Sequence, residues 1–504
     1  MRFLIYAIML VFSFSSSAFA QDISEQNLRD HIEILASDDF EGRKPGTIGE
    51  NKTVQYIANA WMRAGLSSAT GTDSWYAPVA LVDRAPLQQA ISFAYMKGNK
   101  RKSVRIGSDQ IKARGADAQT RLMDQPLVHV GYGNQSAEQL QAAISGKVAM
   151  MFLAAPAGSK DFPSYRVRKA KIVAAGAAGV ISIITNQARY NRTVRRYQRN
   201  STSLDQSGEH APVEAIMFGE AADKLLRKAG IDHVFWQEKF KNEAAAILET
   251  NIMGSFVLET QVRRYVSHNV IGKIDGRKPQ SGAVLFLGHW DHLGVCRGDS
   301  AEDRICNGAV DNASGIALLI EVAKKLAKAP LDRDIYFLAT TAEESGLLGA
   351  RAFVAAPSVA LDRLVAVFNA DTVALAPNGK LLAIVGRGET QLDSDIEKLA
   401  AAHDREIDKS DKANAFIKRQ DAYVFLKRGI PSFMITSAFS DQKRLDDYLN
   451  GRYHDVGDEL DDSLLLGGAR DDANFHVELG RYFGTIDSYA ASSEAKTAPI
   501  SSGE

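Results

Sequence analysis

The sequence is poor in features that several classes of protein need. Its 504 residues include only two cysteines, and neither has a CxxC partner, which argues against a cysteine-ligated zinc site. The formal net charge is −1, so the overall charge does not point to nucleic acid or to an acidic membrane surface. No later segment is long and apolar enough to cross a membrane, and no repeat of about 20 to 50 residues is visible. These absences leave an ordinary globular chain, whose length predicts two or three domains.

The N-terminus has the composition of an export signal. Met1-Arg2 is followed by the apolar run 3–14 and then by small residues, with Ala18 and Ala20 at spaced positions. This order predicts a secretory signal peptide that is cut after Ala20, and therefore a periplasmic or secreted protein. The alternative is a membrane anchor, but about 12 apolar residues are too few to span a bilayer comfortably.

The two cysteines lie close together in the sequence. Cys296 and Cys306 enclose the polar segment RGDSAEDRI. In an oxidising compartment such a pair favours a disulfide over two free thiols. We therefore expect a loop closed by a Cys296–Cys306 bond.

The apolar pattern changes character along the chain. Apolar residues three and four apart predict helices over 23–35 and 51–66, and short strand-like runs follow from about 80 to 240. After residue 268, strands alternate with helices: strands at 283–288, 335–341, 364–370 and 431–436, and helices at 314–326 and 347–355. Continuous apolar strands separated by helices predict an α/β fold, in which a mixed, mostly parallel sheet is sandwiched by helices.

Polar side chains follow three of these strands at the points where the strands end. His289 and Asp291 follow strand 283–288, Glu343 and Glu344 follow the next strand, and Asp371 follows the third. In an open α/β sheet the site lies outside the carboxyl ends of the strands. We therefore expect these side chains to meet at one edge of the sheet.

Two further residues join this set. Asp311 lies in GAVDNASG at the start of helix 314–326, and His454 lies in GRYHDVGDEL after the fourth strand. Each residue alone has a structural explanation, since an Asp before a helix is commonly an N-cap. Together, the structural explanation requires five coincidences on one sheet edge, so we favour a common site.

The residue types restrict the chemistry of this site. Two histidines and three carboxylates are nitrogen and oxygen ligands that suit zinc, and less often manganese or cobalt. With one shared carboxylate they can hold two ions roughly 3.5–4 Å apart. A glutamate next to a ligand is then free to act as a general base. Asp291, two residues after His289, is placed to fix the tautomer of that histidine.

With GHWDH, GAVDNASG, TTAEESGLLGA, FNADTV and GRYHDVGD in this order, the chain resembles the di-zinc aminopeptidase family. This family has the zinc exopeptidase (phosphorylase/hydrolase-like) fold, and its relatives include glutamate carboxypeptidase II and the transferrin receptor ectodomain. The resemblance covers about 25–75 and 245–490. It implies two zinc ions per chain, with Asp311 as the bridging ligand and with the other ligands His289, Glu344, Asp371 and His454. It also implies Glu343 as general base, Asp291 as the residue that orients His289, and a cis peptide bond between Asp311 and Asn312.

The middle of the chain resembles a protease-associated (PA) domain, on the stretches ISGKVAMMFLAAP and KAKIVAAGAAGVISIIT. This resemblance implies a β-rich α+β insert that caps the active-site cleft and supplies no metal ligand. The predicted division of the chain is a signal peptide at 1–20, the first part of the peptidase domain at 21–80, the PA domain at 81–242, the main peptidase domain at 243–490 and a disordered tail at 491–504.

The chain departs from the family pattern at one place. Many members have Ser-Asp-His before the segment that matches YVFLKRGIPSFMI, whereas this chain has Gln420-Asp421-Ala422. The resemblance therefore does not define the substrate pocket near Asp421, although the metal set is unaffected.

The leading hypothesis is an exported zinc aminopeptidase that removes N-terminal residues from peptides, with no nucleic-acid partner and no stable membrane insertion after signal cleavage. A carboxypeptidase, a dipeptidase or a single-zinc enzyme similar to glutaminyl cyclase is the alternative on the same fold. A catalytically silent binding ectodomain is disfavoured, because all five ligand types and the adjacent glutamate are present. The sequence leaves open the preferred N-terminal residue and the oligomeric state.

Overall fold

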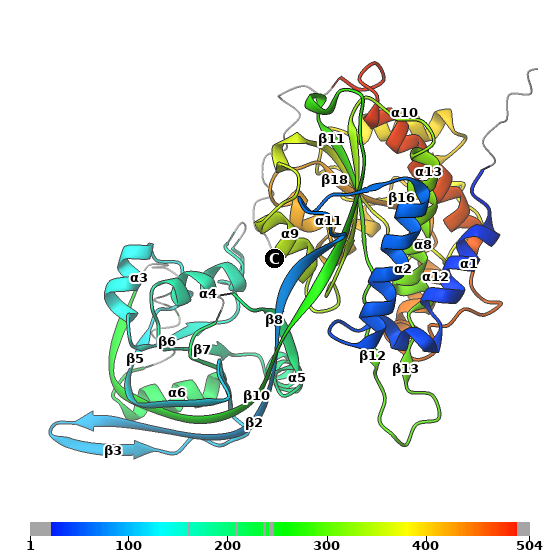
Figure 1. Cartoon of the computed structure of the whole chain (residues 1–504). Coiled ribbons are helices and arrows are strands. Elements are labelled where there is room, and N and C mark those ends of the chain that lie inside the picture. The colour runs from blue at the N-terminus through cyan, green and yellow to red at the C-terminus, as the bar shows by residue number, and fades with distance from the viewer. Residues whose placement is uncertain are drawn as a thin grey trace, which may run out of the picture.

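The structure is a computed structural model that describes residues 22–490 apart from 160–161, 207–209, 233, 235–237, 239 and 241–245. It has two bodies joined by the long paired strands β2 (Tyr76–Lys97) and β10 (Leu248–Ile274) (Figure 1). Three predictions concern residues outside the described ones: the signal peptide, the tail and the domain boundary at 242–243. The predicted domain boundary at 80–81 falls inside β2. Among the described helices, none combines the length and the apolar character that a membrane span requires.

The larger body is built on a mixed sheet. Strands β11, β14, β15 and β18 run parallel to their neighbours in this group, whereas β10 and β16 are antiparallel additions at either side. The strand order is β17 (Glu406–Ile407), β16 (Leu381–Val385), β18 (Ser432–Thr436), β15 (Leu364–Asn369), β11 (Ala283–His289), β14 (Asp334–Thr340) and β10. The predicted mixed, mostly parallel sheet is therefore confirmed.

Helices cover both faces of this sheet, as Figure 1 shows. One layer contains α1 (Glu25–Leu35), α2 (Ile48–Ala64), α8 (Ser314–Leu326), α10 (Asp393–Ala402) and α13 (Leu466–Gly484), and the other contains α9 (Leu348–Ala355) and α11 (Ala422–Leu426). Successive side chains of a strand point to opposite faces. Phe286 therefore packs in the first layer, and Leu285 and Leu287 pack in the second. Burial on both faces explains why every residue of β11 is buried and why its sequence is continuously apolar.

The second body is formed by the chain between β2 and β10. Strands β5, β6, β7 and β9 run parallel in that order, and β4 pairs antiparallel with β9. Its elements are β3 (Lys100–Val104), β4 (Ile111–Gly115), β5 (Gln119–His129), α3 (Ala137–Ile144), β6 (Val148–Phe152), α4 (Tyr165–Ala174), β7 (Gly179–Ile184), α5 (Gln187–Tyr197), β8 (Ser201–Leu204), β9 (Val213–Phe218) and α6 (Gly219–Lys228). Leu204 of β8 belongs to the same buried apolar cluster as Ala342 and Leu348 of the larger body. This cluster joins the second body to the segment that precedes Glu343. The assignment of the second body as a PA domain stays a prediction.

A buried charge cluster lies in the second body around Glu214 of β9. Its carboxylate is 3.2 Å from the guanidinium of Arg114, 2.7 Å from Nζ of Lys169 and 2.9 Å from Nδ1 of His210. Arg114 faces Glu214 directly across the β4–β9 pair. Burial alone would raise the pKa of Glu214, but His210, Lys169 and Arg114 together hold it below its ordinary value. The ionised carboxylate therefore stabilises the fold.

Glu214→Gln is expected to lower the free energy of unfolding by about 2 kcal/mol at pH 7, because it leaves the partly buried cations Arg114 and Lys169 without their anion. Since the folded-state pKa is depressed, this contribution is present above the ordinary pKa of about 4.3 and is lost as the pH falls below it. Chemical denaturation of both proteins at several pH values measures the difference. Glu249→Gln is the matched control, since it breaks the exposed pair with Lys147 and should change stability by about 0.5 kcal/mol or less. A Glu214→Gln protein as stable as this control would contradict the prediction.

Candidate metal centre

The carboxyl ends of three neighbouring strands bring the predicted ligands to one place. His289 ends β11 and lies opposite Thr340, the last residue of β14. Glu343 and Glu344 follow β14 after a short turn, and Asp371 follows β15, which pairs with β11 on its other side. Parallel pairing alone therefore places these side chains at one sheet edge, as expected from the sequence.

The five predicted ligands form two groups that share Asp311. In the first group, Nε2 of His289 lies 3.1 Å from one oxygen of Asp311 and 3.6 Å from Oδ1 of Asp371. In the second group, Nε2 of His454 lies 3.4 Å from the other oxygen of Asp311 and 2.9 Å from Oε2 of Glu344. The structure thus brings together side chains that are up to 165 positions apart in the sequence.

The donor set fits divalent cations. The carboxylates of Asp291, Asp311, Glu343, Glu344 and Asp371 lie within one buried or partly buried site. Such a concentration of like charge is costly without cations to neutralise it. The buried Oδ2 of Asp291 and Nε2 of His292 also have no hydrogen-bond partner among the described residues. Nitrogen and carboxylate donors in groups of three match the ligand preference of zinc.

Asp311 lies in a turn before α8, and other side chains hold this turn in place. Its peptide bond to Asn312 is cis, as the resemblance implied. The amide of Asn312 donates to the carbonyls of His289 (3.2 Å) and Ala370 (3.0 Å), so it ties together the ends of β11 and β15. The carboxylate of Asp458 accepts the backbone N–H groups of Val310 and Asp311, at 3.0 and 3.1 Å. Asp311 is therefore positioned by hydrogen bonds to its own backbone turn.

Arg43 is a second support that the sequence did not reveal. It is 1% exposed and donates to four backbone carbonyls, those of Leu35, Trp290, Asn307 and Gly308. Two of these carbonyls lie next to the segments that carry His289 and Asp311. No local sequence pattern marks a single arginine in a glycine-rich loop as a residue that supports a metal site. Asp458, by contrast, lies inside the GRYHDVGDEL motif.

Asp291 was expected to orient His289 through its carboxylate, but its contacts are different. Nδ1 of His289 lies 3.0 Å from the backbone carbonyl of Asp291, whereas the carboxylate oxygen is 3.8 Å away. The carboxylate instead accepts the backbone N–H of Glu343 at 3.0 Å. The residue Asp291 thus orients His289 through its main chain, and its side chain holds the segment that carries Glu343.

The acidic groups of the site have shifted pKa values. Burial raises the pKa of Asp291 to about 7. Burial also raises the pKa of Glu343 well above its ordinary value, and Asp421 and Glu344 add to this shift while His289 opposes it. Burial acts in the same direction on Asp311, but hydrogen bonds with His289 and His454 hold its pKa well below the ordinary value. Asp311 is therefore held in its ionised form, whereas the carboxyl of Glu343 has a raised proton affinity.

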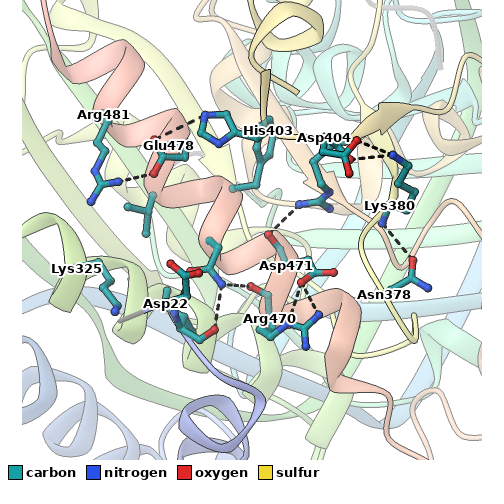
Figure 2. A pocket seen from close by; sticks show the side chains of 15 residues that line it. Asp22, Lys325, Asn378, Lys380, His403, Asp404, Arg470, Asp471, Glu478 and Arg481 are labelled. Carbon is teal, nitrogen blue, oxygen red and sulfur yellow. Dashed lines mark hydrogen bonds and ion pairs between the residues drawn. The ribbon is translucent and has the colours of Figure 1, made fainter. Parts of the chain in front are cut away.

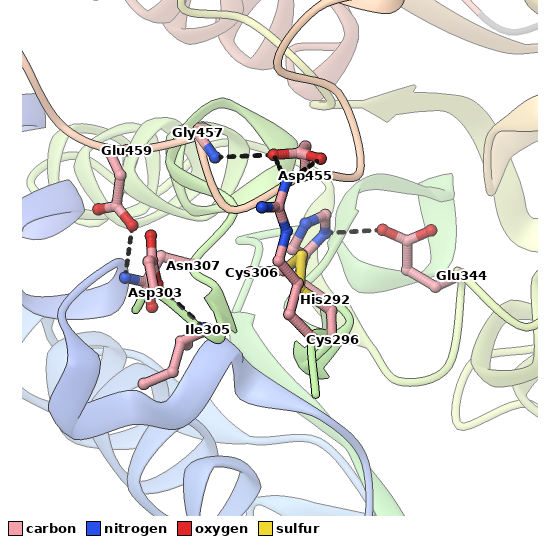
Figure 3. Close-up of a disulfide and its surroundings, with 11 residues drawn as sticks. His292, Cys296, Asp303, Ile305, Cys306, Asn307, Glu344, Asp455, Gly457 and Glu459 are labelled. Atoms are coloured by element: carbon pink, nitrogen blue, oxygen red, sulfur yellow. Dashed lines mark hydrogen bonds and ion pairs between the residues drawn. A yellow bond between two sulfur atoms is a disulfide. The ribbon is translucent and has the colours of Figure 1, made fainter. Parts of the chain in front are cut away.

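His292 belongs to the site although it was not among the predicted ligands. Its ring is fully buried, and Nδ1 lies 2.8 Å from Oε1 of Glu344 (Figure 3). It also forms a close group with Asp311 and Glu344. The motif GHWDH contains His292, but the sequence does not define its role. A histidine three residues after His289 can be either a metal ligand or a residue that orients one.

Part of the chain matches a known protein family. Residues 269–467 match the family model described as Peptidase family M28. This segment contains all five predicted ligands and Glu343. A vacuolar membrane protease of Candida glabrata is 26% identical over 25% of this chain and 12% of its own length. A probable leucine aminopeptidase 2 of Aspergillus fumigatus is 23% identical over 63% of this chain and 58% of its own length. The chain thus spans less than two thirds of either relative.

A solved structure shows the same fold at low sequence identity. It is an aminopeptidase from Aneurinibacillus sp. strain AM-1, with a TM-score of 0.50, 18% identity, and coverage of 95% of this chain and 97% of that one. At this identity the likeness shows the fold alone.

The predicted disulfide lies beside the candidate metal centre. Cys296 and Cys306 are bonded, and they join the short paired strands β12 (Gly294–Val295) and β13 (Ile305–Cys306) (Figure 3). This hairpin packs closely on the 3₁₀ segment 38–43. Gly42 has φ +63°, and a Cβ there would lie 2.3 Å from the carbonyl oxygen of Cys306. The bonded hairpin therefore helps to position the segment that carries Arg43.

Two cavities of the larger body differ in chemistry. A cavity of about 640 Å³ is lined by charged residues of α13 and its surroundings, which pair with one another, as Lys380 does with Asp404 at 3.0 Å (Figure 2). None of the predicted ligands lines it. A cavity of about 30 Å³ adjoins the metal centre and is lined by the apolar side chains of Phe416, Met434, Phe439 and Leu449, together with His289, Asp311, Glu343, Asp371, Thr372, Arg419, Gln420 and Tyr453. A cavity of this size holds no more than a few water molecules, so it marks the reacting end of the candidate substrate site, beside Glu343 and the predicted ligands.

Proposed function

We propose that this protein is an exported zinc aminopeptidase with two zinc ions per chain. The observation that carries the proposal is the pair of ligand groups that share Asp311, with Glu343 beside them. His289 and Asp371 would complete one zinc site, and Glu344 and His454 the other. Bound zinc would supply Lewis acidity, which polarises a peptide carbonyl and lowers the pKa of water towards neutrality.

The chain's own groups then manage the proton. Glu343 takes a proton from the attacking water and gives it to the leaving amine, so one carboxyl serves both steps. Its raised pKa favours the uptake of a proton. Asp291 keeps Glu343 in place through the backbone N–H.

The division of the chain is part of the same proposal. Residues 1–20 are a signal peptide, 21–80 and 243–490 form the peptidase domain, 81–242 form an inserted PA domain, and 491–504 form a tail. The Cys296–Cys306 disulfide supports an oxidising compartment, periplasmic or extracellular.

A panel of aminoacyl reporters, each with a free and an N-acetylated amine, tests this proposal. We expect hydrolysis of the free-amine reporters, loss of activity with a metal chelator, recovery with zinc, and about two zinc ions per chain by elemental analysis. Equal hydrolysis of the acetylated reporters would refute the aminopeptidase, and a single zinc ion would favour the cyclase-like alternative.

A further inference from the structure

Arg419 is a cationic residue in the wall of the candidate substrate cavity. It ends the 3₁₀ segment Lys412–Arg419, and it lines the same cavity as His289, Asp311 and Glu343. The other described lining residues are carboxylates, apolar side chains, neutral polar groups and the histidine. A positive charge at this position faces the space that a substrate must enter.

The guanidinium of Arg419 has no carboxylate within ion-pair distance among the residues that the structure describes. Other arginines of the same region have one: Arg387 pairs with Glu397, Arg405 with Asp472, and Arg452 with Asp461. Arg419 instead donates to the hydroxyl of Tyr453 at 3.3 Å. Its charge is therefore available to a ligand.

Two aromatic rings fix the position of this guanidinium. It lies 5.1 Å from the ring centre of Phe416 and 5.7 Å from that of Tyr453. Stacking against rings leaves the donor edges of the guanidinium exposed and limits its motion. A fixed fork of N–H donors matches the two oxygens of a carboxylate.

The distance to the metal centre sets the size of the ligand. The ring of Tyr453 is stacked on that of His454, with centres 3.7 Å apart, so Arg419 is one aromatic side chain away from a proposed zinc ligand. An extended peptide advances roughly 3.5 Å per residue. A carboxylate one or two residues beyond the scissile bond therefore reaches Arg419.

We infer that Arg419 binds the α-carboxylate of short peptides and makes dipeptides and tripeptides the favoured substrates. This inference rests on the proposed function, since it assumes that the scissile bond lies at the metal centre. Arg419 is a specificity-determining residue in this scheme, because it touches the end of the substrate and not the reacting atoms.

Paired substrates test the inference. The peptides Leu-Ala, Ala-Ala and Leu-Ala-Ala are assayed as free acids and as C-terminal amides, with the wild-type protein and with Arg419→Gln, Arg419→Lys and Arg428→Gln. Arg428 is the matched control, because it is an exposed arginine on the same stretch that does not line the cavity. The measured quantity is the ratio of kcat/KM for acid over amide.

We expect the wild-type ratio to be about tenfold in favour of the acids, as for a charge-assisted hydrogen bond at a partly exposed site. Arg419→Gln should reduce this ratio to near one, mainly through KM, while Arg419→Lys keeps part of it and Arg428→Gln keeps all of it. Added salt should also reduce the wild-type ratio, because the contact is exposed. A wild-type ratio near one, or an Arg419→Gln protein that loses both substrates equally, would overturn the inference.

Failure of the proposed function is separable from failure of this inference. If neither the acids nor the amides are hydrolysed, the aminopeptidase proposal fails. Calorimetric titration of the same peptide pairs then still decides the role of Arg419. Tighter binding of the acid that disappears in Arg419→Gln supports the inference, and equal binding of acid and amide overturns it.

Discussion

Replacing Glu343 by Gln should lower kcat by about a hundredfold to ten-thousandfold while the protein keeps its zinc, since general acid–base groups typically contribute 10²–10⁴ in rate. Glutamine has the shape of glutamate but cannot accept the proton of the attacking water. Glu343 contacts neither of the two ligand histidines at ion-pair distance among the described contacts, so the metal groups should survive the change. Steady-state kinetics on a free-amine reporter, beside elemental analysis of the same sample, measure both quantities.

The neighbouring residue provides a control for this prediction. Glu344→Gln changes the next carboxylate along the chain, which lies 2.9 Å from His454 and 2.8 Å from His292. This variant should lose zinc along with activity, whereas Glu343→Gln loses activity alone. Full turnover in Glu343→Gln would remove that residue from the proton transfer, and loss of zinc in it would make it a ligand.

The sequence is most informative where strand pairing determines position. The order of strands and polar residues is enough to group His289, Glu344 and Asp371, because the ends of adjacent parallel strands lie at one edge. Helix 314–326 is predicted with its observed bounds, since its apolar spacing is regular. These parts of the fold follow from the spacing of apolar residues and from the order of strands and polar residues along the chain.

Other parts depend on contacts that leave no local pattern. Arg43 and Asp458 act through hydrogen bonds to backbone groups, and any sequence supplies such groups. The long strand β2 was expected only as short pieces, and no strand was predicted over the residues of β10. The central sections of both strands mix exposed and buried positions irregularly. The contact of the Asp291 carboxylate with Glu343, 52 positions away, depends on the turn after β14.

Asp311→Asn should remove both zinc ions and with them all measurable turnover. The two oxygens of Asp311 face different histidines, His289 at 3.1 Å and His454 at 3.4 Å, so one substitution affects both groups. An amide carries no charge and offers a single oxygen to cations, and therefore cannot bridge two of them. Zinc content should fall from about two ions per chain to about half an ion or less, with activity at least about a thousandfold lower.

Asp371→Asn is the matched comparison, because Asp371 lies 3.6 Å from His289 and belongs to one group only. It should retain about one zinc ion per chain, in the group of Glu344 and His454. Asp455→Asn, on the loop beside His454 but paired with Arg297, should retain both. The order of zinc content, Asp455→Asn above Asp371→Asn above Asp311→Asn, follows from the number of groups that each carboxylate serves. Equal zinc content in Asp311→Asn and Asp371→Asn would mean that Asp311 serves a single ion, and the proposed bridged centre would have to be replaced by two independent sites or by one.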